Sequence, residues 1–97
     1  APQALMFINN PQVRSYAHAF AKQLSDLKDK SPEATIRHAY LQAIAREPDA
    51  DELSTATTFL VEQAKSYQAD GKANAQELAL ADFCQVLFGL NEFVYVE

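Results

Sequence analysis

Residues 74–89, which read NAQELALADFCQVLFG, decide the fold of this chain. The main apolar stripe recurs at helical spacing and consists of Leu80, Phe83, Cys84, Leu87 and Phe88. Further apolar side chains, at Leu78, Ala81 and Val86, lie off that stripe. A helix that is apolar almost all round is usually the most buried helix of its domain. We therefore expect a central helix that begins at Asn74 and ends with Gly89 as its C′ residue.

Three amphipathic helices are expected before it, each with a start signal. The first begins at Asn10-Pro11 and the second at Ser31-Pro32, where an N-cap residue precedes a proline. The third begins at Asp49, with Glu52 at the spacing of a capping box. The expected ends are Lys28-Asp29-Lys30, Arg46-Glu47 before Pro48, and Asp70-Gly71-Lys72.

Each of these helices carries one apolar stripe at helical spacing. The stripes are Val13, Tyr16, Ala17, Phe20, Ala21 and Leu24 in the first; Ile36, Ala39, Tyr40, Ala43 and Ile44 in the second; and Leu53, Ala56, Thr57, Leu60, Val61, Ala64 and Tyr67 in the third. Helices that bury one face must pack on each other, and short loops favour antiparallel neighbours.

The two ends of the chain are predicted to close this core. Residues 5–8 (Leu5-Met6-Phe7-Ile8) read as the last turn of a short helical segment, and residues 93–96 (Phe93-Val94-Tyr95-Val96) read as an extended tail that packs back on the helices. The predicted fold is all-α: a compact bundle of four main amphipathic helices, with a short N-terminal helical segment and an extended C-terminal tail. We expect one domain over residues 1–97, cut from a longer multi-domain chain.

Composition narrows the function classes. The chain has 97 residues, 48% of them hydrophobic, and a net charge of −5 with a pI near 4.9. An acidic domain is repelled by phosphate backbones and anionic lipid surfaces, so we expect no nucleic-acid partner, and its apolar stretches are too short for membrane insertion. Cys84 is the single cysteine. It cannot form an internal disulfide, a cysteine-based zinc site or a haem attachment motif.

Four polar residues near the C-terminus are the candidate site residues. Asp82 and Gln85 interrupt the apolar helix at i, i+3. They either line a site or make hydrogen bonds that fix a neighbouring loop, and the structural interpretation is favoured because most buried polar groups are paired within the protein. Asn91 and Glu92 are expected in a turn after that helix. We assign no catalytic, cofactor-binding or metal-ligating residue, and we interpret Cys84 as an inert core side chain.

Three segments of the sequence together carry a family resemblance. They are Leu5-Met6-Phe7-Ile8-Asn9-Asn10-Pro11-Gln12-Val13, Tyr40-x-x-Ala43-x-x-Arg46-x-Pro48-x-x-x-Glu52-Leu53, and Ala81-Asp82-Phe83-Cys84-Gln85-Val86-Leu87-Phe88-x-x-Asn91-Glu92-Phe93-Val94-Tyr95-Val96. The chain resembles the C-terminal part of the planctomycete-specific domain of unknown function that closes large exported planctomycete proteins. The closing segment around Asn91-Glu92-Phe93 is the most specific of the three.

The resemblance implies an extracytoplasmic parent, periplasmic or secreted, with cytochrome-like domains upstream as partners; the sequence itself indicates no compartment. It implies no catalytic residue. The residues and the resemblance leave three hypotheses for the function. The first is a non-catalytic structural or interaction module at the C-terminus of a large exported bacterial protein. The second is one wall of an enzymatic or redox site shared with upstream domains, formed by Asp82, Gln85 and the Asn91-Glu92 turn, and the third is a standalone adaptor with an apolar patch from Phe7, Phe59 and Phe93. Substrate, partner identity and oligomeric state stay open.

Overall fold

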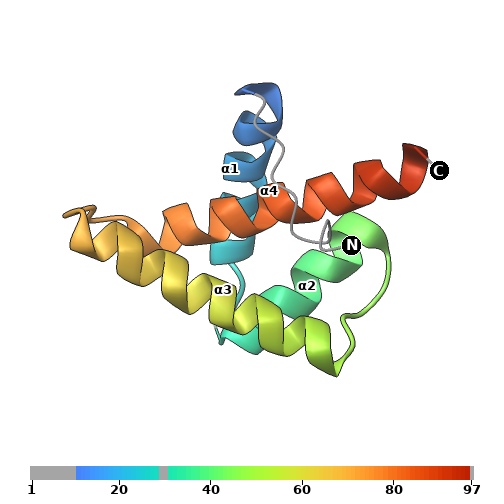
Figure 1. Cartoon of the computed structure of the whole chain (residues 1–97), viewed down its shortest axis with the longest axis horizontal. Helices are drawn as coiled ribbons and strands as arrows, with labels where there is room; N and C mark the ends of the chain where they lie inside the picture. The colour runs from blue at the N-terminus through green and yellow to red at the C-terminus, as the bar shows by residue number, and fades with distance from the viewer. Residues whose placement is uncertain (1–10, 29–30, 97) are drawn as a thin grey trace.

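Four helices form where the sequence supplies caps and apolar stripes. The computed structural model describes residues 11–28 and 31–96, and this part of the chain contains no strand. The helices are α1 (Pro11–Ser25), α2 (Pro32–Ile44), α3 (Ala50–Ala69) and α4 (Ala75–Val96) (Figure 1). The Ser31 hydroxyl accepts a hydrogen bond from the Ala34 amide, and Asp49 and Glu52 form a complete capping box. The all-α prediction and both of these caps are confirmed.

Helix α4 lies at the centre, as predicted. It runs antiparallel to α3 while α1 lies across it, and α2 closes the space beside α3 (Figure 1). The largest contact surfaces of α4 are with α1 and α3. Its residues 79–87 are all buried, and Cys84 and Leu87 are completely excluded from solvent. The core is therefore built around one helix that its neighbours cover on several sides.

The crossing of α1 over α4 corrects one expectation. Antiparallel neighbours were expected where loops are short, that is, everywhere except around residues 70–74, whereas in Figure 1 α1 lies across α4 and the pair that runs antiparallel is α3 and α4. A crossing helix buries the part of its stripe at the crossing point, so Ala17 and Ala21 are fully buried, whereas Tyr16 is 59% exposed. The assignment of Tyr16 to a buried stripe was wrong for this reason. The assignment of Val61 of α3 to a buried stripe was also wrong, since Val61 is 43% exposed.

The predicted end of α4 is also wrong. The helix passes through Gly89 and continues to Val96, so residues 93–96 are helical and not extended. A glycine inside a helix costs about 1 kcal/mol. The flanking contacts offset this cost, because Phe88 stacks on Phe20 with ring centroids 5.7 Å apart and Leu90 packs against the core. The predicted segment 5–8 and the Asn10 cap lie outside the described residues.

Candidate functional site

Asp82 in the middle of α4 is the centre of a polar network. Its Oδ1 accepts a hydrogen bond from Arg14 Nη1 of α1 at 2.6 Å. Its Oδ2 accepts two from α3, one from Gln63 Nε2 at 2.7 Å and one from the Tyr67 hydroxyl at 2.8 Å. Arg14 Nη1 also donates to Gln85 Oε1 at 2.9 Å. The two candidate residues on α4 are therefore brought together, and both contact the same guanidinium group.

The network is buried at Asp82 and more exposed to solvent at Arg14. The side chain of Asp82 is 5% exposed and that of Arg14 is 29% exposed. Burial, together with the hydrogen bond that its hydroxyl donates to Asp82, raises the pKa of Tyr67. Among the described side chains, no buried nitrogen or oxygen is left without a hydrogen-bond partner. A buried carboxylate is tolerable only with such partners.

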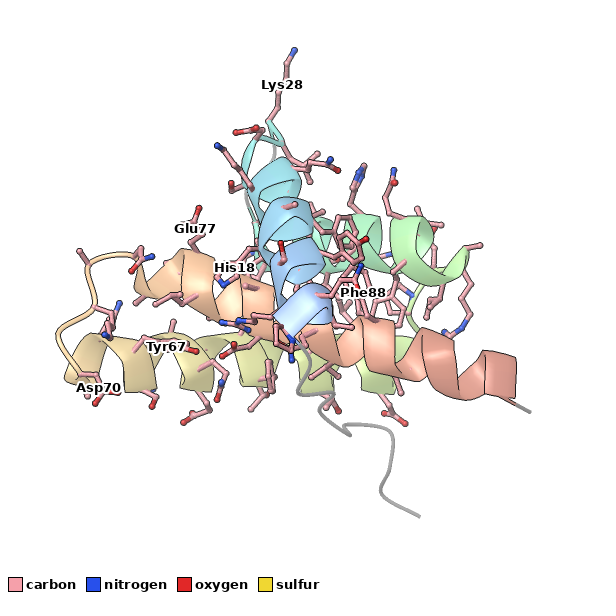
Figure 2. All side chains as sticks on the ribbon, turned by 90° about the horizontal axis from the view of Figure 1, so that it is seen from above. His18, Lys28, Tyr67, Asp70, Glu77 and Phe88 are labelled. Carbon is pink, nitrogen blue, oxygen red and sulfur yellow. The ribbon has the colours of Figure 1, made fainter. Side chains whose placement is uncertain are left out.

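The network also explains how α1 and α3 are connected. These two helices have no direct backbone contact, whereas both pack on α4. The side chains of Arg14 from α1 and of Gln63 and Tyr67 from α3 all converge on Asp82, and Figure 2 shows Tyr67 on α3. Because both carboxylate oxygens already accept internal hydrogen bonds, Asp82 is positioned to join helices.

Asn91 and Glu92 do not share this location. They belong to the last turns of α4, so the turn predicted for them is wrong, and their side chains lie outside the part of the structure that is described. Asn91 lies nine positions after Asp82 along the helix, which corresponds to about 14 Å at 1.5 Å per residue.

Cys84 occupies the core as expected. It is completely buried, and burial raises the pKa of its thiol to about 12. A nucleophilic cysteine needs a lowered pKa and an accessible sulfur atom. Cys84 has neither property, so its environment is that of a small apolar side chain.

A second network fixes the turn between α2 and α3. Arg46 donates both guanidinium Nη groups to the Glu52 carboxylate at 2.7 Å, and its Cζ lies 5.5 Å from the ring centroid of Tyr40. Glu52 Oε1 also accepts from the Asp49 amide at 2.9 Å. The hydrogen bonds from Arg46 hold the pKa of Glu52 below its usual value. These residues belong to the middle segment that carried the family resemblance, and their contacts fix the geometry of the turn between α2 and α3.

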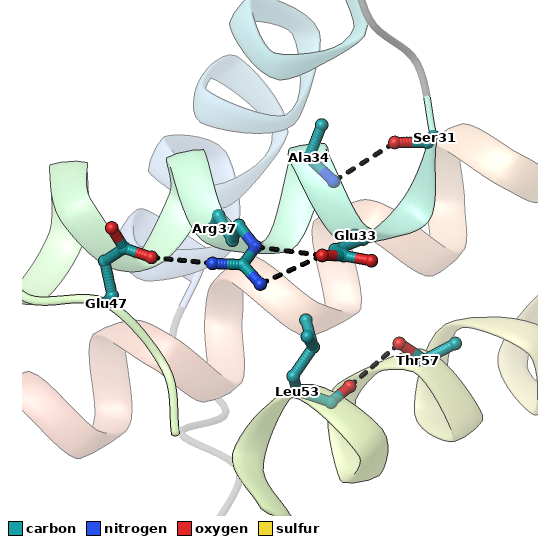
Figure 3. A network of polar contacts seen from close by, with 7 residues as sticks. All are labelled: Ser31, Glu33, Ala34, Arg37, Glu47, Leu53 and Thr57. Atoms are coloured by element: carbon teal, nitrogen blue, oxygen red, sulfur yellow. Dashed lines mark hydrogen bonds and ion pairs between the residues drawn. The ribbon is translucent and has the colours of Figure 1, made fainter. Parts of the chain in front are cut away.

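Sequence reasoning missed a neighbouring surface network. The guanidinium group of Arg37 donates to Glu33 Oε2, at 2.9 and 3.2 Å, and to Glu47 Oε1 at 2.8 Å (Figure 3). The i, i+4 spacing of Glu33 and Arg37 was a readable signal. All three side chains are exposed, so this network bridges α2 and the following loop at the surface.

The described part of the chain lacks two further features. Residues 11–28 and 31–96 contain no group of three His, Cys, Asp or Glu side chains that could hold a metal ion. Within the same residues, no helix combines the length and hydropathy needed to cross a membrane.

Comparison with known proteins places the chain in a family. A family model described as "PSD1: Protein of unknown function (DUF1553)" matches residues 1–60, more than half of the chain. No curated protein and no solved structure matches it. The match confirms the resemblance to the planctomycete-specific domain, although it ends within α3 and does not include the closing segment at residues 81–96. The chain belongs to the PSD1 family of proteins of unknown function, DUF1553.

Proposed function

We propose that this chain is a non-catalytic structural or interaction module at the C-terminus of a large exported bacterial protein. The observation that carries the proposal is the engagement of Asp82, whose two oxygens accept three hydrogen bonds from α1 and α3. The side chain of Asp82 is 5% exposed, and its hydrogen bonds hold the helices together. Export and the C-terminal position are inferred from the family resemblance.

The alternative is one wall of an enzymatic or redox site shared with upstream domains. That hypothesis requires Asp82 and Gln85 to face a cleft, so that they can reach a substrate or cofactor held by another domain. Both residues are buried, with 3% and 1% of their surface exposed, and both accept hydrogen bonds from Arg14. Their burial favours the structural role.

A standalone adaptor is also less well supported. Of the three aromatic residues considered for its patch, Phe59 packs against the core cluster and is only partly exposed. Phe7 and the side chain of Phe93 lie outside the described residues. A contiguous exposed patch of several hundred Å² would be needed for this role.

Elemental analysis and visible absorption spectroscopy of the purified 97-residue chain test the proposal. We expect less than stoichiometric metal and no haem band after purification without chelators. The chain is also incubated with haem or with Zn²⁺ and then desalted, and we expect neither to be retained. One tightly held metal or haem per chain, lost in an Asp82→Asn variant that still folds, would contradict the proposal and favour the shared site.

A further inference from the structure

We draw no further inference here: the strongest candidate, the groove of about 700 Å³ that the end of α1 and the start of α2 form with α3 and α4, is lined by both Lys65 and Glu77, so its charge selects no partner, and nothing in the described part of the chain shows what covers it.

Discussion

Asp82→Asn is the sharpest perturbation of this fold, because it changes the hydrogen-bonding chemistry without changing the shape. One carboxylate oxygen becomes an amide nitrogen that cannot accept a hydrogen bond from Arg14, Gln63 or Tyr67. At least one donor on α1 or α3 then loses its partner, and Arg14 loses its counter-charge. A buried unpaired group costs about 1–3 kcal/mol, and a hydrogen bond to a charged group contributes about 1.5–3 kcal/mol.

The expected cost is about 3 kcal/mol of unfolding free energy. Breaking a buried ion pair costs about 3–5 kcal/mol when the remaining charge cannot reach water. Arg14 keeps 29% of its side chain exposed, so water offsets part of that penalty. The loss is still a large fraction of the about 5–15 kcal/mol that holds a domain of this size together.

Urea denaturation followed by circular dichroism at 222 nm measures this cost. We expect the midpoint of Asp82→Asn to fall by more than about 1 M, since small proteins lose about 1–3 kcal/mol per molar urea. Glu62→Gln is the control, because it removes one carboxylate charge at an exposed position of α3. If Asp82→Asn proves too unstable, the same comparison is made in an Ala45→Gly background. A midpoint for Asp82→Asn that equals that of Glu62→Gln would refute the structural role of the network.

Three further predictions concern the turns, the core thiol and the acid limb of stability. Ala45 caps α2 in the left-handed region at φ 61°, and Gly71 follows α3 at φ 78°. Ala45→Gly should therefore raise the unfolding free energy by about 1 kcal/mol and Gly71→Ala lower it by a similar amount, with opposite shifts of the melting temperature; equal shifts would contradict this. Cys84, with its thiol pKa raised to about 12 by burial, should not react with a disulfide reagent at pH 8 until urea unfolds the chain, and stoichiometric reaction of the native protein would disprove the burial. Because the hydrogen bonds from Arg46 lower the pKa of Glu52, this carboxylate stabilises the fold above the ordinary glutamate pKa, and that stability is lost as pH falls through the lowered value. The stability difference between the parent chain and Glu52→Gln should therefore shrink below about pH 4, and a difference independent of pH would show that the carboxylate charge plays no part.

The helices and their caps could be predicted because their causes are local. Ser31 and Asp49 lie directly before apolar stripes, so a few neighbouring residues contain the whole signal. The burial of α4 was predictable for a similar reason, since a helix that is apolar on nearly every side needs cover from several neighbours. The position at which α4 ends could not be predicted, because its causes are not local. Gly89 suggests a stop, but Phe88 and Leu90 are held by distant parts of the chain.

The polar network could be predicted only in part. Asp82 and Gln85 could be recognised as polar residues in an otherwise apolar helix, and such buried residues need hydrogen-bond partners. The identity of those partners depends on contacts over long sequence separations: Asp82 lies 68 positions after Arg14. Arg14 lies outside the apolar stripe of its helix, and no spacing rule links it to α4. The crossing of α1 over α4, which brings them together, is a property of the tertiary packing.

Amide hydrogen exchange of the parent chain and of Asp82→Asn, compared residue by residue, tests the central claim most directly. The claim is that one buried carboxylate on α4 holds α1 and α3 in place. It predicts that the variant loses protection selectively in residues 14–24 of α1 and residues 60–68 of α3, while the turn network around Arg46 and Glu52 keeps its protection relative to global unfolding. Unchanged protection of α1 in the folded variant would contradict the claim and return Asp82 to the status of a candidate for chemistry.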